Sequence, residues 1–208
     1  MSSPAAQEFG QEYATEQLRR SRHPLRRLLK GFYLRHLLSN VHGPCIDFGC
    51  GAGQLLARLP PGSVGLEVNP HLLHALRAAG MQVREARADI HDFKLTGFPR
   101  DTYRTLVIAH VLEHLPDPAA ALRILLAACR KLGVGRVIVV VPGAKGYAAD
   151  RTHKTLIDRA WLEAQVPVQD EGFVRRPPTY FPGRWEWIGR YFVFHEMHVV
   201  FDRVADLR

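Results

Sequence analysis

The polar and apolar residues of this chain alternate between the patterns of short strands and amphipathic helices. Runs of strand length occur at 45–47, 64–68, 81–86, 104–109 and 136–141. Between them, apolar residues return every three or four positions, as in the helix expected to begin at Asp117 and Pro118. This order predicts an α/β fold: a doubly wound, mostly parallel sheet that binds ligands at the carboxyl ends of its strands.

The last third of the chain departs from this pattern. A polar loop is expected at 143–154, and the runs 172–176 and 191–202 predict two closing strands that form an antiparallel hairpin at the sheet edge. Between these strands lies an aromatic stretch that contains Trp185 and Trp187. We expect this stretch to be an apolar lid packed on the sheet edge.

The N-terminal region is amphipathic and strongly basic. Apolar residues from Leu25 to Leu37 repeat with helical spacing, so residues 1–40 are expected to form a helical extension of a domain at 41–208. No acid lies between residues 17 and 46, and the formal net charge is +8. Such a segment is a solvated helix face, or a surface for nucleic acid or an anionic membrane. Its basic residues are Arg19, Arg20, Arg22, Arg26, Arg27, Lys30 and Arg35.

Composition narrows the class of protein. With 208 residues, of which 47% are hydrophobic, the chain suits one globular α/β domain. No apolar run approaches the length of a membrane span, and the N-terminus lacks the pattern of a signal peptide, so we expect a cytoplasmic protein. The chain has an odd number of cysteines, and they lack the spacing of zinc ligands, which predicts no disulfide and no metal site. They are Cys45, Cys50 and Cys129.

The stretch Cys45–Gln54, C-I-D-F-G-C-G-A-G-Q, carries the main binding signal. A strand ends near Asp47, and glycines follow at every second position before apolar helix residues begin. Gly49, Gly51 and Gly53 permit positive φ and the close approach of a ligand, while a strand-to-helix turn presents N–H groups to that ligand. The stretch therefore predicts a nucleotide-type binding loop.

Two acids further along the chain suit other parts of a nucleotide. Glu67 lies at the tip of the second predicted strand, where a carboxylate can accept two hydrogen bonds from a ribose diol. Asp89 lies where the third predicted strand ends. It could accept a hydrogen bond from an exocyclic amine such as that of adenine, or it could form a turn.

Taken in order, these motifs resemble those of class I S-adenosylmethionine-dependent methyltransferases. The resemblance rests on D-F-G-C-G-A-G, Glu67, A-D-I at 88–90, A-H-V-L-E-H-L-P-D-P at 109–118 and V-V-V-P-G at 139–143. It implies a seven-stranded sheet and S-adenosylmethionine as the cofactor. One departure is L-G-V-G-R at 132–136, where the family often has a Pro-Gly-Gly turn.

The resemblance also assigns parts of the cofactor to residues of this chain. Asp47 and the three glycines would line its methionine part, and Glu67 would hold the ribose. Asp89 and Ile90 would frame the adenine, and His110 would lie along the cofactor and face the substrate. The cofactor-binding residues expected on this basis are Asp47, Gly49, Gly51, Gly53, Glu67, Asp89, Ile90 and His110.

The activity implied is methyl transfer to a small-molecule or lipid-linked acceptor, at oxygen rather than at nitrogen or carbon. A hydroxyl acceptor must lose a proton, and histidine has a suitable pKa for taking it. The first candidate for this catalytic role is His153, with Asp150 three residues before it; His110 and His114 are the alternatives, and a structural role is favoured for His114. The family counterpart of His114 is structural or, together with Glu113, meets a divalent metal in some members.

Two other functions fit part of the same pattern. The first is an RNA or protein methyltransferase that uses the basic N-terminal segment to hold its substrate. The second is a nucleotide-binding protein without transfer chemistry, such as a dinucleotide dehydrogenase or a cofactor-binding scaffold. The glycine spacing and the presence of Asp89 argue against a dehydrogenase.

Overall fold

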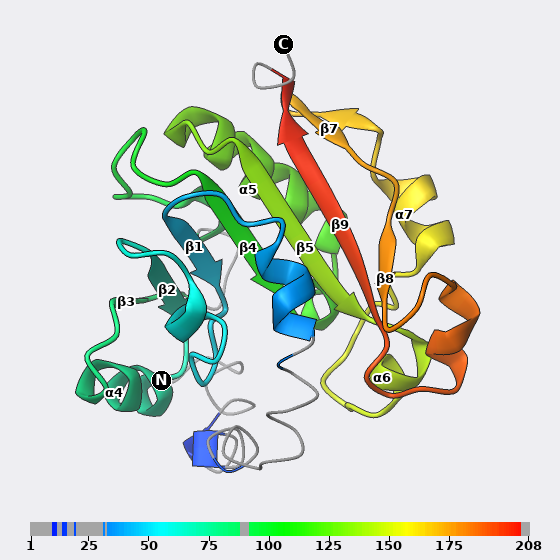
Figure 1. The fold of residues 1–208 in the computed structure, drawn as a ribbon, viewed down its shortest axis with the longest axis horizontal. Helices are drawn as coiled ribbons and strands as arrows, with labels where there is room; N and C mark the ends of the chain where they lie inside the picture. Colours follow the sequence, from blue (N-terminus) through cyan, green and yellow to red (C-terminus); the bar gives the residue numbers. More distant parts are fainter. Residues whose placement is uncertain are drawn as a thin grey trace.

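A mixed sheet forms the centre of this computed structural model, which describes residues 10, 11, 14, 15, 19, 31, 33–87 and 92–204 (Figure 1). Within these residues the sheet has nine strands, in the order β3-β2-β1-β4-β5-β9-β7-β6, and β8 pairs with β9. The strands are β1 (Cys45–Phe48), β2 (Val64–Glu67), β3 (Val83–Glu85), β4 (Thr105–Ala109), β5 (Arg136–Pro142), β6 (Gln169–Asp170), β7 (Phe173–Arg175), β8 (Thr179–Phe181) and β9 (Glu196–Arg203).

The helices connect and cover these strands. The α-helices are α4 (Pro70–Ala78), α5 (Pro118–Leu132), α6 (Ala144–Ala148) and α7 (Arg159–Gln165). Single 3₁₀ turns are η1 (Leu56–Arg58), η2 (Asp92–Lys94), η3 (Leu112–His114) and η4 (Glu186–Arg190). Asp117 caps α5 by accepting a hydrogen bond from the backbone N–H of Ala120, and Pro118 is its first residue, as the sequence predicts.

The first five strands are mutually parallel, and β9 runs antiparallel to β5. These pairings confirm the α/β class, the parallel arrangement and the antiparallel C-terminal strands expected from the sequence. Since β1, β2 and β4 point the same way, their carboxyl ends meet at one edge of the sheet. The glycine loop, the β2–α4 turn and η3 all begin at this edge.

Apolar side chains pack on both faces of the sheet. On one face, α5 buries Leu122, Leu125 and Leu126 against the core. On the other face, helical residues 33–38 lie across the strands (Figure 1), and Leu37 packs with Val107 and its neighbours. Burial on both faces explains why the strands read as nearly continuous apolar runs.

Three local features differ from the sequence expectation. The sheet has nine strands in the described residues rather than seven, because Gln169–Asp170 and Thr179–Phe181 form the short strands β6 and β8. The polar loop expected at 143–154 contains the helix α6. The helix after the glycine loop is only the 3₁₀ turn η1, which ends before Pro60 and Pro61.

The expected aromatic lid is formed only in part. Tyr180 and Phe181 pack against the core, but the two tryptophans do not. Trp185 is 61% exposed and Trp187 is 59% exposed, so neither indole covers the sheet edge. The side of η4 that faces the protein is instead filled by buried Gly189 and His195, which leave no space for larger groups. The side chains of Trp185 and Trp187 are therefore exposed to solvent.

The N-terminal extension is described only in part. Tyr33 and Leu37 are buried, as the apolar stripe predicts, and Leu34, which lies outside the predicted stripe, is buried as well. The stripe from residue 25 to 32 and the basic residues between 20 and 30 lie outside the described residues, so the extension at 1–40 and its boundary stay predictions. In the described part of the chain, no helix combines the length and apolar character needed to cross a membrane.

The ion pair of Asp202 with Arg136 gives a stability prediction. Asp202 is buried, accepts a hydrogen bond at 2.7 Å from Nε of Arg136 and also pairs with Arg176. Asp202→Ala leaves the mostly buried Arg136 guanidinium without its counterion, so we expect the free energy of unfolding to fall by roughly 3 kcal/mol. Urea denaturation followed by circular dichroism measures the change.

The matched control is the exposed ion pair between Arg159 and Glu163 on α7. Glu163→Ala should change stability little, because exposed pairs are screened by solvent. Similar losses in the two variants would show that burial does not set the strength of the Asp202 pair.

Candidate functional site

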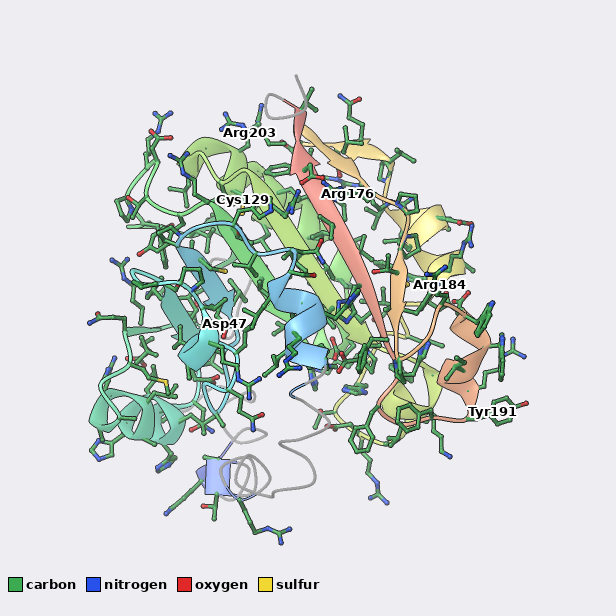
Figure 2. All side chains as sticks on the ribbon, in the orientation of Figure 1. Asp47, Cys129, Arg176, Arg184, Tyr191 and Arg203 are labelled. Atoms are coloured by element: carbon green, nitrogen blue, oxygen red, sulfur yellow. The ribbon has the colours of Figure 1, made fainter. Side chains whose placement is uncertain are left out.

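A cavity of about 380 Å³ opens at the carboxyl ends of β1, β2 and β4. Its walls come from the glycine loop, the β2–α4 turn, η3 and the helical residues 33–38. Asp47, which Figure 2 labels, contributes a buried carboxylate from β1. The remaining polar wall includes Glu67, His110, His114 and Lys154. The cavity therefore gathers most of the residues that the sequence singles out.

The glycines shape the wall of the cavity in two different ways. Gly49 has φ +76°, and a Cβ there would lie 2.4 Å from Cγ2 of Val111, so no side chain fits. Gly51 has φ +54° but open space beside it, so its requirement is conformational. Together they let the backbone turn from β1 along the cavity without a side chain between it and a ligand.

The carboxylate of Glu67 ties two segments of this wall together. Oε2 accepts a hydrogen bond from the N–H of Gly51 at 2.8 Å, and Oε1 accepts from the N–H groups of Val68 and Asn69 at 2.9 and 2.8 Å. Burial raises the pKa of Glu67, while these three N–H groups favour the charged form. Oε1 thus accepts two hydrogen bonds and Oε2 accepts one, which leaves one of the four lone-pair sites, on Oε2, for a ribose hydroxyl.

The predicted adenine site is described only at its borders. Asp89 and Ile90 lie outside the described residues, and their expected role stays a prediction. On either side of them, Ala86, Arg87 and Phe93 line the cavity. This end of the cavity is thus mostly apolar, as suits a flat base.

Three histidines gather on the side of the cavity away from Glu67. His110 follows β4 with φ +57°, and its Nε2 lies 2.9 Å from Oε1 of Glu196 while its Nδ1 lies 3.3 Å from Oε1 of Glu113. The backbone carbonyl of Glu113 accepts hydrogen bonds from the N–H groups of Lys154 and Thr155, which fixes the loop that carries His153 beside η3.

A family model described as a methyltransferase domain matches residues 16–185. This match covers most of the chain, including every segment that lines the cavity. The protein belongs to the methyltransferase domain family.

Solved structures agree with this assignment at the level of the fold. An S-adenosylmethionine-dependent methyltransferase from Archaeoglobus fulgidus has a TM-score of 0.59 and 17% identity, over 85% of this chain and 94% of that one. Magnesium protoporphyrin IX methyltransferase from Synechocystis PCC 6803, with bound S-adenosylhomocysteine, has a TM-score of 0.61 and 14% identity over 96% and 98%.

A third similar structure is a putative methyltransferase from Haloferax volcanii, in complex with the Trm112 methyltransferase activator. Its TM-score is 0.65 and its identity 15%, over 95% of this chain and 96% of that one. No curated protein matches the sequence. At such identities the structural similarity shows a shared fold.

S-adenosylmethionine is the cofactor of this methyltransferase, and the cavity fits it. The buried carboxylate of Asp47 provides negative charge near the glycine loop, which suits an amino-acid ammonium. Glu67 offers a remaining acceptor site on Oε2 for a ribose hydroxyl, and the backbone at Gly49 leaves no side chain in the way. The contacts of each residue with the cofactor stay predictions.

The charge state of His110 argues against a role as a base. Partial burial of the ring lowers its pKa, but Glu196 and Glu113 outweigh this and raise the pKa of His110 to about 10. The imidazole is therefore protonated at neutral pH and has no lone pair to take a proton. It instead neutralises two buried carboxylates at the edge of the cavity.

The environment of His114 lowers its pKa, in contrast to that of His110. Nδ1 lies 3.0 Å from Oγ1 and 3.3 Å from the carbonyl oxygen of Thr152, and the Thr152 hydroxyl donates to Oδ1 of Asp150 at 2.7 Å. With the hydroxyl proton used in this way, Nδ1 must be the donor toward Thr152. Burial lowers the pKa of His114, so the ring is neutral at physiological pH and Nε2 carries its lone pair.

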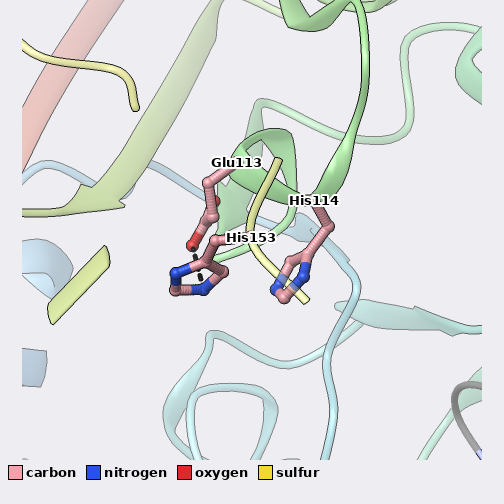
Figure 3. Close-up of side chains that lie close together, drawn as sticks. All are labelled: Glu113, His114 and His153. Atoms are coloured by element: carbon pink, nitrogen blue, oxygen red, sulfur yellow. Dashed lines mark ion pairs between the residues drawn. The ribbon is translucent and has the colours of Figure 1, made fainter. Parts of the chain in front are cut away.

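His153 lies one layer behind His114. Its Nδ1 donates to the carbonyl oxygen of Tyr147 at 2.8 Å, and its Nε2 lies 3.9 Å from Oε1 of Glu113 (Figure 3). Its ring contacts those of His114 and Tyr147, with centroids 4.7 and 5.4 Å away. The cavity wall includes His110 and His114 among the described residues, whereas His153 supports that wall from behind.

Glu113, His114 and His153 could also hold a divalent cation. One ligand atom from each lies within 4.8 Å of the others, and neither oxygen of the buried Glu113 carboxylate has a hydrogen bond within the described residues. Ligands of one tetrahedral ion at about 2.1 Å lie closer together than this, so the side chains would have to shift inward. The imidazolium of His110 already places a positive charge beside Glu113, as a metal ion would. The expectation from the sequence that the protein has no metal site stays a prediction.

Several residues of the site were not expected from the sequence. Glu196 reaches His110 from β9, and Tyr33 reaches the cavity from the N-terminal helical residues. Glu196 is an acid within the largely apolar last strand, and this position could have indicated that it has a partner inside the protein. Asp150 followed by Thr152 is typical of a side chain to backbone turn, which was a signal for the contact with His114.

The pKa of His110 gives a prediction on the pH dependence of stability. Its value rises from 6.5 to about 10 in the folded protein, so the charged ring stabilises the fold fully below pH 6.5 and loses this effect as the pH approaches 10. We expect His110→Gln to be less stable than wild type at neutral pH, with a difference that shrinks over this range. Urea denaturation at a series of pH values measures it.

Exposed His74 on α4 supplies the control, since His74→Gln removes a histidine far from any described carboxylate pair. A stability difference for His110→Gln that stays constant from pH 6.5 to 10 would contradict the assigned charge state.

Proposed function

We propose that this protein transfers the methyl group of S-adenosylmethionine to a hydroxyl or other acidic oxygen of a small-molecule or lipid-linked acceptor. The observation that carries the proposal is His114, a neutral imidazole in the cavity wall that Thr152 and Asp150 orient with Nδ1 as donor. An oriented imidazole with a lowered pKa is suited to take a proton from an acceptor. Acceptors that carry no proton to lose would not need it.

The proposed step follows from this orientation. When bound, S-adenosylmethionine supplies a sulfonium methyl group that needs only an aligned nucleophile. The acceptor oxygen gives its proton to Nε2 of His114 and its electron pair to the methyl carbon, while the bond between carbon and sulfur breaks and its electrons remain on the sulfur. Thr152 holds the ring during the step, and Asp150 stabilises the imidazolium that forms.

A lysine at the same side of the cavity supports an acidic acceptor. The exposed Lys154 lines it, whereas the charge of His110 is balanced by Glu113 and Glu196. Lys154 would attract an acceptor that carries a carboxylate, a phosphate or an acidic hydroxyl. Tyr33, whose pKa burial raises well above its usual value, stays a hydrogen-bond donor in the cavity wall.

The other functions expected from the sequence have less support. The RNA or protein alternative depends on the basic segment, most of which lies outside the described residues. A scaffold without transfer chemistry would not need the oriented His114, although the fold alone would be compatible with it. A cytoplasmic location stays a prediction.

Glu67 supplies the test of cofactor binding. We expect calorimetry to show binding of S-adenosylhomocysteine and no binding of a nicotinamide dinucleotide. In Glu67→Gln the amide oxygen can serve the N–H groups of Val68 and Asn69, but an NH2 group replaces the acceptor that faces Gly51 and the ribose, so we expect binding of S-adenosylhomocysteine to weaken by roughly 1 to 3 kcal/mol.

The control for this variant is Glu85→Gln. Glu85 is the register partner of Glu67 on β3 and is exposed. Unfolding curves of both variants separate a loss of binding from a loss of fold. Equal affinity in wild type and a folded Glu67→Gln variant would remove Glu67 as the ribose ligand.

The paired variants His114→Asn and His153→Asn test the chemistry. Asparagine keeps a donor at the position of Nδ1 but removes Nε2, so both variants preserve the contacts to Thr152 and Tyr147. With labelled S-adenosylmethionine and fractionated small-molecule and lipid extracts, we expect His114→Asn to lower methyl transfer about 10²-fold or more. Binding of S-adenosylhomocysteine should stay unchanged in this variant, and the loss in His153→Asn should be smaller.

The opposite ranking of the two variants, with cofactor binding intact, would return the role of base to His153. Transfer of label to RNA or protein but to neither extract would favour the alternative substrate class. Absence of any transfer by a protein that binds S-adenosylhomocysteine would favour a scaffold.

A further inference from the structure

The segment between β8 and β9 exposes an unusual number of large apolar side chains. Tyr191 is 71% exposed, and Trp185 and Trp187 are each about 60% exposed. We call this surface the aromatic face; its residues are Trp185, Trp187, Tyr191, Phe192, Val193 and Phe194. In Figure 2, Tyr191 extends from the ribbon toward solvent. Contiguous exposed apolar residues of this size indicate an interaction surface.

The backbone beneath the aromatic face is firmly held. Buried His195 donates from Nε2 to the carbonyl oxygen of Trp185 at 3.1 Å, and its own carbonyl oxygen accepts from the N–H of Gly143 at 2.8 Å. Nζ of Lys145 donates to the carbonyl oxygen of Tyr191 at 2.8 Å. The aromatic rings are thus exposed on a segment whose backbone is held in place by hydrogen bonds.

Basic residues surround the aromatic face. Lys145, Arg184 and Arg190 are exposed beside it, whereas Glu186 is the one acid of the segment 184–194. The N–H of Arg159 already donates to Oε1 of Glu186. Aromatic side chains with Lys and Arg around them are suited to the interface of a bilayer, where rings enter the headgroup region and cations meet anionic lipids.

The aromatic face lies at the same edge of the sheet as the cavity. η4 packs on α6, which follows the carboxyl end of β5, and the cavity opens at the carboxyl ends of β1, β2 and β4 (Figure 1, orange segment beside α6). A surface that met the aromatic face would therefore lie near the entrance through which an acceptor must pass.

We propose that the aromatic face and its basic residues dock this methyltransferase on an anionic lipid surface. The aromatic face combines exposed rings with exposed basic residues, which suits insertion among anionic headgroups better than the core of a protein interface, where charged residues are depleted. Docking does not depend on methyl transfer. Delivery of a lipid-linked acceptor from the bilayer to the cavity is its consequence, and that consequence rests on the proposed function.

The test uses the full chain with vesicles of phosphatidylcholine, with and without phosphatidylglycerol. Two of the three tryptophans lie on the aromatic face, and Trp161 packs against the core, so insertion should shift the emission of the protein to shorter wavelength. We expect co-sedimentation and this shift only with the anionic vesicles. Brominated lipids should quench Trp185 and Trp187, and added salt should weaken binding.

Matched variants locate the contact. Trp187→Ser should lower vesicle affinity about tenfold, since it removes a large interfacial side chain, whereas Val168→Ser, at an exposed apolar residue outside the face, should not. Arg184→Glu should lower affinity roughly tenfold or more. Arg77→Glu, at an exposed arginine on α4, makes the same charge change elsewhere and should have little effect.

No vesicle binding, or binding that these variants leave unchanged, would overturn the proposal. Self-association of the protein in light scattering that Trp187→Ser abolishes would also overturn it, because a second copy would then cover the face. Binding of S-adenosylhomocysteine by each variant separates these results from a failure of the proposed function.

Discussion

Three backbone N–H groups converge on the buried carboxylate of Glu67, and the cavity depends on this arrangement. The donors come from the glycine loop after β1 and from the turn after β2. A loop rich in glycine has high conformational freedom, so it needs a fixed partner to keep its N–H groups directed. The same carboxylate that holds the loop also faces the cavity, which links the shape of the site to its chemistry.

On the side of the cavity formed by η3, a positively charged histidine offsets two carboxylates. Glu113 and Glu196 are removed from water, and a buried carboxylate without a positive neighbour would be costly. His110 lies between them and is held in its charged form, whereas burial lowers the pKa of the nearby His114 and keeps that ring neutral. Two histidines four residues apart thus have opposite protonation states because their neighbours differ.

The predictions that succeeded were those that depend on neighbouring residues in the chain. The five parallel strands, the cap of α5 by Asp117 and the position of Glu67 at the end of β2 follow from local spacing. Those that failed depend on contacts between distant segments. The aromatic stretch was predicted to pack inward, but buried His195 and Gly189 occupy the space on the sheet side.

The sequence by itself determined the fold class through periodicity, and its ordered motifs resembled a family whose cofactor is S-adenosylmethionine. Both signals are encoded by residues close together in the chain, whereas the contacts of the glycine loop with the cofactor stay predictions. Only the tertiary structure decided the surroundings of the histidines, and with them their charge states. His110 meets Glu196 from β9, and Thr152 orients His114 from a loop that hydrogen bonds to η3. The charge and tautomer of an imidazole depend on partners brought together by folding, and no local pattern specifies them.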